Sequence, residues 1–574
     1  MADPLYGAFA CGPPFSLDTP PDPAIIAATL VQTDPARMPA TVQKPALTWP
    51  LLIFLLCPSL ARAETAVQAW VQRYNGPGNF DDYASAVAVD GSNNVVVTGT
   101  SDVSEGASNP GYVTIKYSSA GVPLWTNRYN GPGNGEDHAR DVAPDGSDNV
   151  IVTGNSRGSG GVSDYATIKY SSEGVPLWTN RYNGPGNFTD GAQAVAVDGS
   201  NNVIVTGVST GSGSASDYAT IKYSGEGVPL WTNRYNGPAN DYDGALAVAV
   251  DGSNNVIVTG ASRTTTVWPR PSAYATIKYS SAGVPLWTNR YHGPVNDDSQ
   301  AVAVAVDGSS NVIVTGYSLG DGSSYDYATI KYSSAGMPLW TNRYNGPGNY
   351  QDKPYAVGVD AGNNVIVTGC STGTGADPDG LSYATIKYSS AGVPLWTNRY
   401  HGPGNGEDYA YDVAVDGSDN VIVTGRSTGT GADPDGLSYA TIKYSSAGVP
   451  LWTNRYNGPG SSEDQARKVT VDHSGNVIVT GRSLGAGSRD DFATIKYAFP
   501  LVITDFRLTN DTFQMLLDNL QPGTLVIEAA TSPAATPPDW SPVFTNTTPT
   551  NVLFYTDSEA ATSPTRFYRA FQSP

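Results

Sequence analysis

The stretch that decides the fold is "YATIKYSSAGVPLWTNRYHGP" at residues 274–294, which recurs along the chain with few changes. Its tryptophan occurs eight times, at positions 70, 125, 178, 231, 287, 340, 396 and 452. Successive tryptophans are therefore 53 to 56 residues apart. A period of this length is typical of a propeller or of a linear array of repeats.

One period contains four short runs that read as β-strands. In the third repeat they are "AVAVD" at 194–198, "VIVTG" at 203–207, "DYATIKY" at 217–223 and "VPLWTNRY" at 228–235. All are rich in Val, Ile, Thr or aromatic residues, and Gly, Asn and Ser turns separate them. No run has helical spacing. We therefore predict an all-β chain that folds as an eight-bladed β-propeller, with one blade of four strands per repeat.

The ends of the repeat array predict how the ring closes. The small residues of "AVAVD" suit the crowded axis, and the aromatic residues of "LWTNRY" suit the wide rim. The chain holds eight inner triplets of strands, but only seven rim strands follow a triplet. The remaining rim strand, "AWVQRY" at 69–74, precedes them all. We expect it to pair with "ATIKY" at 493–497 in the last blade, which removes the open sheet edges.

The repeat also resembles a known family. "DYATIKYSSEGVPLWTNRYNGP" at 164–185 and "AVAVDGSNNVIVTG" at 194–207 resemble the bacterial β-propeller repeat abbreviated SBBP. They are similar in outline to the NHL and delta-60 types of repeat. The resemblance covers about residues 65–497. It implies an exported or cell-surface protein of bacterial type, and it supplies no catalytic residues.

The first 63 residues read as a leader rather than as part of the propeller. Lys44 precedes the apolar run at 51–57, and Ala61, Arg62 and Ala63 fit the small-x-small cleavage pattern of a signal peptide. We expect residues 1–37 to be an upstream segment without structure, residues 38–63 a signal peptide, and residues 64–500 the propeller. The expected product is secreted or held at the cell surface, with no membrane span in the mature chain.

Residues 501–574 break the repeat pattern. "FRLTN", "FQMLLDNL", "TLVIEAAT", "WSPVFTN", "NVLFYTD" and "RFYRAF" read as six short strands separated by turn residues. They predict a small C-terminal β-sandwich, similar to the immunoglobulin-like and fibronectin-like modules of exported proteins.

Charge and cysteine content exclude several classes of partner. The chain has 52 acidic and 32 basic residues, a net charge of -20, so a phosphate backbone would be repelled and we expect no nucleic-acid partner. Only Cys370 follows the leader, which leaves no internal disulfide and no cysteine metal site. We expect a monomer without a resident cofactor, and Ca²⁺ is the one ion for which the sequence offers candidate ligands.

A series of aspartates marks the crossover from each rim strand to the next inner strand. In seven repeats it lies eight residues before the Asp that ends "AVAVD", and in the fifth repeat it lies nine before. If these carboxylates met around the channel mouth, they would bind Ca²⁺ or a cationic ligand. The alternative, which we favour, is that each aspartate only fixes its own crossover loop. The candidate ligand-binding residues are Asp82, Asp137, Asp190, Asp243, Asp298, Asp352, Asp408 and Asp464.

The loops between "VIVTG" and "YATIKY" vary most from repeat to repeat, and they open on the same face. A constant scaffold with variable loops is typical of a recognition surface. In these loops we identify Trp268 and Arg270 as candidate ligand-binding residues. The loops reading "DPDG" resemble the start of a calcium loop but lack its later acidic ligand. The candidate Ca²⁺ ligands are Asp377, Asp379, Asp433 and Asp435.

These observations predict a non-enzymatic binding or adhesion module that recognises carbohydrate or protein through the variable loops. One alternative is an extracellular enzyme that uses the channel mouth, such as a polysaccharide lyase or a quinoprotein. A lyase needs a singular cluster of Tyr, His, Lys or Arg, for which His138 is the only hint. The quinoprotein docking motif fails because Tyr170 and Tyr223 stand where it requires Asp. The other alternative is a purely structural spacer at the cell surface.

Overall fold

A computed structural model describes residues 66–499, except 103–108, 214, 268–269, 375–379, 405, 430–435 and 461–462. It also describes the strand Ile26–Val31 and six strands between Val502 and Ser573. The chain divides into two compact units, residues 58–498 and residues 1–57 with 499–574. Every regular element of the described residues is a β-strand.

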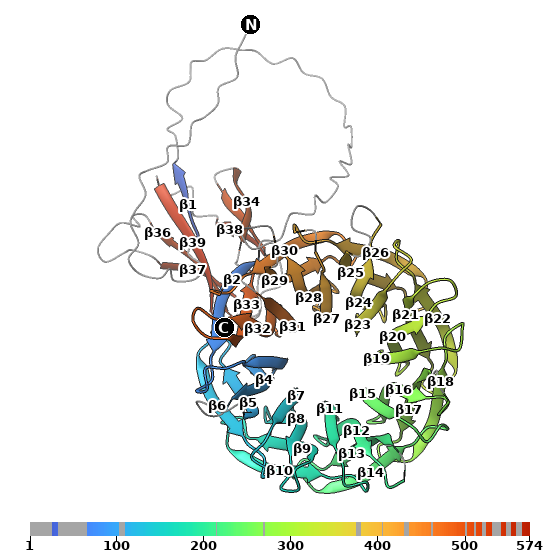
Figure 1. The fold of residues 1–574 in the computed structure, drawn as a ribbon. Helices are drawn as coiled ribbons and strands as arrows, with labels where there is room; N and C mark the ends of the chain where they lie inside the picture. The colour runs from blue at the N-terminus through green and yellow to red at the C-terminus, as the bar shows by residue number, and fades with distance from the viewer. Residues whose placement is uncertain are drawn as a thin grey trace, which may run out of the picture. The chain divides into compact units, whose positions relative to one another are not determined.

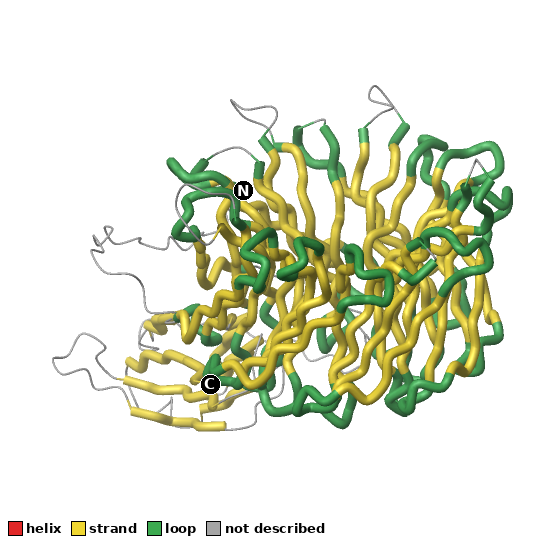
Figure 2. Tube along the Cα trace, turned by 60° about the horizontal axis from the view of Figure 1, so that its bottom comes forward, coloured by secondary structure: helices red, strands yellow, loops and turns green. Residues whose placement is uncertain are grey.

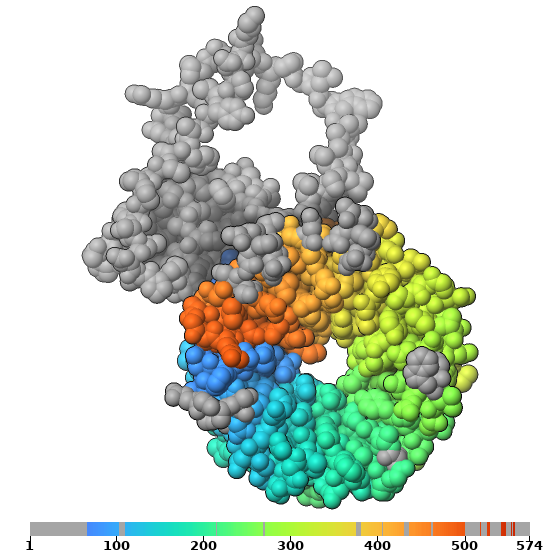
Figure 3. Space-filling view, viewed as in Figure 1, coloured from blue at the N-terminus to red at the C-terminus, as the bar shows by residue number. Residues whose placement is uncertain are grey.

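The larger unit is an eight-bladed β-propeller, as predicted. Its eight four-stranded antiparallel sheets surround a central axis (Figure 1), and the space-filling view shows the ring open at its centre (Figure 3). From the axis outward, blade 1 has strands β3 (Tyr83–Val89), β4 (Val95–Asp102), β5 (Pro110–Tyr117) and β6 (Pro123–Tyr129). Blade 2 has β7 (Asp137–Pro144), β8 (Val150–Arg157), β9 (Ser163–Tyr170) and β10 (Pro176–Tyr182). Blade 3 has β11 (Asp190–Val197), β12 (Val203–Thr210), β13 (Ser216–Tyr223) and β14 (Pro229–Tyr235).

Blades 4 to 7 repeat this order of strands. Blade 4 has β15 (Asp243–Val250), β16 (Val256–Arg263), β17 (Ser272–Tyr279) and β18 (Pro285–Tyr291). Blade 5 has β19 (Ser299–Val306), β20 (Val312–Leu319), β21 (Tyr325–Tyr332) and β22 (Pro338–Tyr344). Blade 6 has β23 (Asp352–Val359), β24 (Val365–Thr372), β25 (Leu381–Tyr388) and β26 (Pro394–Tyr400). Blade 7 has β27 (Tyr409–Val415), β28 (Val421–Thr428), β29 (Leu437–Tyr444) and β30 (Pro450–Tyr456).

Blade 8 confirms the predicted closure. It combines β31 (Asp464–Val471), β32 (Val477–Leu484) and β33 (Asp490–Ala498) with the N-terminal strand β2 (Val67–Tyr74) as its rim. Arg73 of β2 donates to Asp491 of β33 across 2.8 Å, which reinforces the pairing. Because strands from both ends of the repeat array share one sheet, the last inner triplet has a rim strand along its outer edge.

Each blade is held to the next by buried polar contacts as well as by apolar packing. In blade 3, Lys222 Nζ lies 2.7 Å from Asp198 Oδ2 and donates to the carbonyl oxygen of Ser281 in blade 4. The rings of Trp178 and Tyr223 pack across the boundary between blades 2 and 3. Gly227 must have no side chain, because its φ is +83° and a Cβ atom would lie 2.8 Å from the indole of Trp178. These contacts explain why the repeated phrase is so constant.

The strands run between two faces of the propeller, and the loops gather at its two ends (Figure 2). One face carries the crossovers from rim strand to inner strand and the loops between second and third strands. The inner strands therefore begin at this face. We call it the crossover face, and the opening of the central channel on it the channel mouth.

The smaller unit contains the six strands predicted for residues 501–574, in two sheets. One sheet pairs β34 (Val502–Thr509), β35 (Thr512–Asp518) and β38 (Leu553–Asp557). The other pairs β36 (Thr524–Ala530), β37 (Ser541–Asn546), β39 (Thr565–Ser573) and β1 (Ile26–Val31). The strand β1 differs from our expectation that residues 1–37 have no structure. Its residues "IAATLV" pair antiparallel with β39, and β1 is the edge strand of this sheet.

Candidate functional site

The predicted aspartate series is buried in the crossover loops. Each of seven carboxylates accepts a hydrogen bond from the backbone N–H of the glycine six residues earlier, at 2.5 to 2.8 Å. Several accept a second N–H from the end of the second strand, as Asp137 does from Arg157 at 2.8 Å. The seven residues are Asp82, Asp137, Asp190, Asp243, Asp352, Asp408 and Asp464, all at most 1% exposed. Through these hydrogen bonds, each aspartate stabilises its own crossover loop.

Burial dominates the electrostatics of these carboxyls. It raises the pKa of Asp82 to about 6, against the lowering effect of the hydrogen bonds from Gly76 and Ser101. The fifth blade departs from the series, because Ser299 occupies the position of the buried aspartate and its hydroxyl donates to Ser318. Asp298 lies one residue earlier and accepts bonds from the N–H of Ser272 and the phenol of Tyr325.

The other candidates from the sequence lie in the loops between second and third strands. Arg270 is exposed, and its guanidinium lies 3.6 Å from a carboxylate oxygen of Asp241. Trp268 and the candidate calcium ligands Asp377, Asp379, Asp433 and Asp435 lie outside the described residues. In the described part of the chain, no group of His, Cys, Asp and Glu side chains is arranged to hold a metal ion. No helix there is long and apolar enough to cross a membrane.

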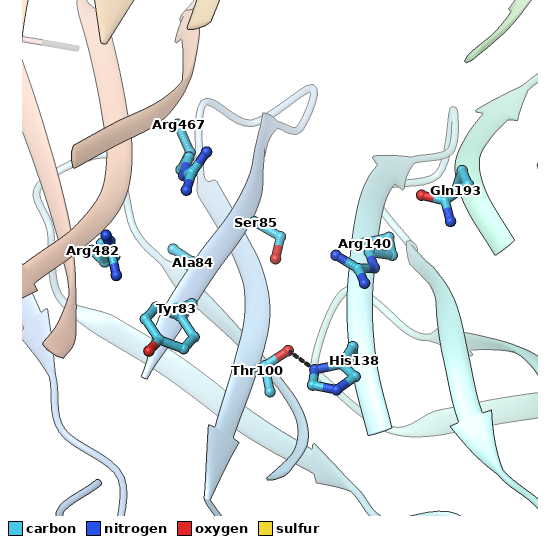
Figure 4. A pocket seen from close by; sticks show the side chains of 9 residues that line it. All are labelled: Tyr83, Ala84, Ser85, Thr100, His138, Arg140, Gln193, Arg467 and Arg482. Carbon is cyan, nitrogen blue, oxygen red and sulfur yellow. Dashed lines mark hydrogen bonds between the residues drawn. The ribbon is translucent and has the colours of Figure 1, made fainter. Parts of the chain in front are cut away.

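The described residues form a cavity of about 490 Å³ in the wall of the channel, near its mouth. Its lining comes from blades 8, 1, 2 and 3, through the first and second strands of these blades (Figure 4). The lining residues are Tyr83, Ala84, Ser85, Thr100, His138, Arg140, Gln193, Arg467 and Arg482. Figure 4 shows Arg467 and Arg482 extending from blade 8, and His138 and Arg140 from blade 2, on either side of Tyr83 and Ser85.

The sequence places all of these residues except Ala84 at three positions of the repeat. Two are the first and third residues after the buried aspartate, and the third lies between Gly and Ser at the end of the second strand. The strand register pairs the first position with the last, as Tyr83 with Thr100 and Gln465 with Arg482. We call these three positions of all eight blades the channel positions. Their identity varies from blade to blade, whereas the buried positions beside them repeat.

Charged and aromatic side chains gather at the channel positions of one part of the ring. Blades 6, 7, 8, 1 and 2 carry the four arginines and most of the tyrosines there. Blades 3 and 4 carry small or uncharged residues instead. The first group includes Lys353, Tyr355, Tyr409, Tyr411, Arg426, Arg467, Arg482, Tyr83, His138 and Arg140. The second is Gly191, Gln193, Val208, Gly244, Leu246 and Ala261.

The arginines differ in how their charge is balanced. Arg482 pairs with Glu463 at 3.0 Å and Asp490 at 2.9 Å, and Arg426 lies 3.5 Å from Glu407. Among the described residues, neither Arg467 nor Arg140 has an acidic partner within ion-pair distance.

The side chain of Arg467 is exposed to solvent in the channel, but it lies near two other guanidinium groups. Burial and the neighbouring guanidinium groups of Arg482 and Arg426 hold its pKa below its usual value. Arginine stays protonated in proteins, so this crowding of positive charge is relieved when an anion binds. The cavity lining thus holds three arginines and no Asp or Glu, in a chain whose net charge is negative.

His138 is the one imidazole of the cavity lining, and a polar side chain lies near each of its ring nitrogens. Its Nδ1 lies 3.3 Å from the hydroxyl of Thr100, and its Nε2 lies 3.8 Å from a carboxylate oxygen of Glu136. Burial and the charge of Arg140 lower the pKa of His138, so the ring is neutral at physiological pH. A neutral imidazole can accept a proton or a hydrogen bond from a ligand.

Comparisons with known proteins support the repeat character of the chain. No family model matches it. It is 24% identical over 432 residues to an uncharacterised WD repeat-containing protein of Acanthamoeba polyphaga mimivirus, covering 60% of this chain and 29% of that protein. This chain thus spans less than a third of that relative's length.

Two solved structures are similar at low identity. The polysaccharide lyase Uly1 has a TM-score of 0.38 and 11% identity, with 76% of this chain and 94% of that chain covered. A protein of unknown function from Dyadobacter fermentans has a TM-score of 0.36 and 9% identity, with 75% and 98% covered. At this level of likeness, activity and ligand have to be inferred from the residues of the chain itself.

Proposed function

We propose that the protein is a binding module whose ligand is an acidic carbohydrate held in the channel-mouth cavity. The observation that carries the proposal is Arg467, a guanidinium of the cavity lining that has no acidic partner among the described residues and lies near the guanidinium groups of Arg482 and Arg426. Arginine is suited to carboxylate and sulfate because its planar fork donates two parallel hydrogen bonds.

The rest of the lining favours a sugar over a simple inorganic anion. Tyr83 offers an aromatic face with a polar end, and Ser85, Thr100 and Gln193 offer neutral hydrogen-bonding groups. The volume of about 490 Å³ lies within the usual range for small-ligand sites. The net charge of -20 does not oppose this, because charges more than about 8 Å away are largely screened at physiological salt.

Export to the cell surface or beyond forms part of the proposal. It is supported by the signal-peptide pattern at residues 38–63 and by the resemblance of the repeats to those of exported proteins. Polysaccharides are accessible to a protein in that compartment. The variable loops, with Arg270, remain a second proposed contact surface on the crossover face.

The test compares acidic and neutral polysaccharides by isothermal titration calorimetry, with and without Ca²⁺. Polygalacturonate, alginate and hyaluronan are the acidic probes, and a neutral β-glucan is the reference. We expect the acidic probes alone to bind, and Arg467→Gln to weaken binding about ten- to hundredfold, the value of a hydrogen-bonded charge pair. Arg270→Gln, a matched loss of one exposed arginine, should leave the affinity unchanged.

Each other outcome has a distinct meaning. Loss of binding in Arg270→Gln but not in Arg467→Gln would move the site to the variable loops. Binding that requires Ca²⁺ and survives Arg467→Gln would favour the "DPDG" loops. Absence of binding to every acidic probe would refute the proposal.

A second candidate function, elimination by a polysaccharide lyase, is favoured by the meeting of His138 and Tyr83 with the arginines in one cavity. In such a step a base removes the proton next to the sugar carboxylate, the glycosidic C–O bond breaks, a C=C bond forms, and the leaving oxygen is protonated. A neutral His138 is suited to accept the proton. Burial raises the pKa of Tyr83, which keeps its phenol protonated and able to donate.

The ultraviolet absorbance of the unsaturated product tests this second candidate. It should rise when a polyuronate is added and should be lost in His138→Ala while binding persists. Binding without any such absorbance leaves the binding module as the function.

A further inference from the structure

Three tyrosines form an aromatic surface beside the cavity. Tyr355 of β23 and Tyr409 and Tyr411 of β27 lie at channel positions of blades 6 and 7. The rings of Tyr409 and Tyr411 are nearly parallel, with centroids 5.9 Å apart and 8° between their planes. Tyr355 leans on Tyr411 at 5.4 Å. We call these three residues the tyrosine platform.

The platform follows from the local sequence. In "YAY" at 409–411, two residues apart on one strand share a face, so both rings stand on the channel side while Ala410 is buried. The equivalent pair in blade 3 is Gly191 and Gln193, and in blade 4 it is Gly244 and Leu246. The repeat scaffold therefore does not require tyrosine at these positions.

Arginines connect the platform to the cavity. The guanidinium of Arg426 lies 4.4 Å from the ring centre of Tyr409, and that of Arg467 lies 4.9 Å from the ring centre of Tyr411. Arg467 also lines the cavity. Since it belongs to both, the platform and the cavity are continuous along the wall of the channel. The continuous surface runs through blades 6, 7, 8, 1 and 2.

We propose that the ligand is a chain of several acidic sugar residues that lies along this surface. The inference rests on the proposed function and adds to it the polymeric nature of the ligand. One carboxylate is held by Arg467 at the cavity, and the neighbouring sugars lie on the tyrosine platform. A polyuronate matches this pattern, because it alternates flat sugar faces with carboxylates, as the wall alternates aromatic rings with guanidinium groups.

A monosaccharide would occupy only one part of this surface. At the described channel positions of blades 3 and 4, Gln193 is the one polar side chain, beside the apolar side chains of Val208, Leu246 and Ala261. A bound chain therefore gains contacts by extending toward blade 6 rather than across the channel. We expect affinity to depend on chain length until the platform is covered.

The experiment is a calorimetric titration of the whole protein with oligogalacturonides of increasing length. The affinity should rise with length by about tenfold or more, the value of one or two aromatic contacts. In the double variant Tyr409→Ala, Tyr411→Ala this gain should vanish, while the dimer still binds. The double variant Tyr409→Phe, Tyr411→Phe keeps the rings and should keep the gain. Leu246→Ala on the opposite wall is the matched control and should behave as the unmodified protein.

The outcomes separate this inference from the proposed function. Affinity that is independent of length, or a gain that persists without both rings, overturns the tyrosine platform but leaves Arg467 as an anion site. No binding at any length overturns both. If the alanine variant fails to fold by circular dichroism, Tyr409→Leu with Tyr411→Leu retains apolar bulk, and it too should lose the gain.

Discussion

The buried lysine–aspartate pairs between blades allow a quantitative test of what holds the ring together. We consider Lys222→Met, because Lys222 and Asp198 are only 2% and 0% exposed and their charged atoms are 2.7 Å apart. Methionine fills a similar volume but has no charge. The variant leaves the carboxylate of Asp198 buried without its counter-ion. Its remaining donors are the backbone N–H groups of Ser200 and Asn202 and the side-chain amide of Asn202.

Removing one partner of a buried ion pair costs about 3–5 kcal/mol. Because N–H donors still contact Asp198, we expect a loss of unfolding free energy at the low end of this range, about 3 kcal/mol. Loss of the hydrogen bond from Lys222 to Ser281 in the next blade adds about 1 kcal/mol. Urea unfolding followed by tryptophan fluorescence measures the loss. The double variant Lys222→Met, Asp198→Asn should recover about half of it, because no unpaired charge stays buried.

The pH dependence gives an independent check. Burial alone would raise the pKa of Asp198, but the bonds from Lys222 and Asn202 outweigh it and lower the pKa. A lowered pKa means that the stabilisation is present above the unfolded value of about 4 and is lost as the pH falls further. The cost of Lys222→Met should therefore shrink in acid.

The matched control is Arg270→Met, whose partner Asp241 is 3.6 Å away and whose side chain is 54% exposed. An exposed pair of this kind contributes about 0–1 kcal/mol. If Lys222→Met cost no more than Arg270→Met, or if the double variant recovered nothing, the buried pairs would not be what joins the blades.

Three further predictions concern the scaffold. Gly207→Ala places a Cβ atom 2.2 Å from the carbonyl oxygen of Gly191, so it should lower the unfolding free energy, measured in urea, by more than about 3 kcal/mol. Gly160→Ala, which has open space around it, should leave the unfolding free energy unchanged. The pKa of Asp82, raised to about 6, means that its ionisation destabilises the fold as pH rises from about 4. The effect of Asp82→Asn on the unfolding free energy, measured in urea, should therefore be up to about 3 kcal/mol more favourable at neutral pH than near pH 4, and equal effects would contradict the assignment. Deleting Val67–Tyr74 exposes the edge of the last blade, so we expect a lower melting temperature and aggregation detected by light scattering. An unchanged melting temperature would refute closure of the ring by this strand.

Most of the propeller could be predicted from the sequence because the repeated positions are those that pack. The four runs per period, the small residues near the axis and the rim strand at 69–74 all follow from local pattern and counting, and all are confirmed. The strand Ile26–Val31 was missed because its partner, β39, lies more than five hundred residues away in sequence, and no local pattern specifies such a pairing.

The candidate site was harder to predict, for a physical reason. The aspartate series drew attention because it repeats, but its carboxylates are committed to their own loops, and a one-residue shift puts Ser299 rather than Asp298 at the buried position. The cavity residues do not repeat, since they face the channel and the scaffold does not constrain them. An alignment of the first and second strands of the blades would have revealed Tyr83, Arg467 and Arg482 as departures from the repeat at channel positions.

We expect the ligand to bind at the channel mouth rather than on the variable loops. A crystal structure of the protein with an oligogalacturonide bound tests it most directly. We predict density for a carboxylate against the guanidinium of Arg467 and for a sugar ring against Tyr411. Density on the loops beside Arg270, with the channel mouth free of sugar, would contradict the claim.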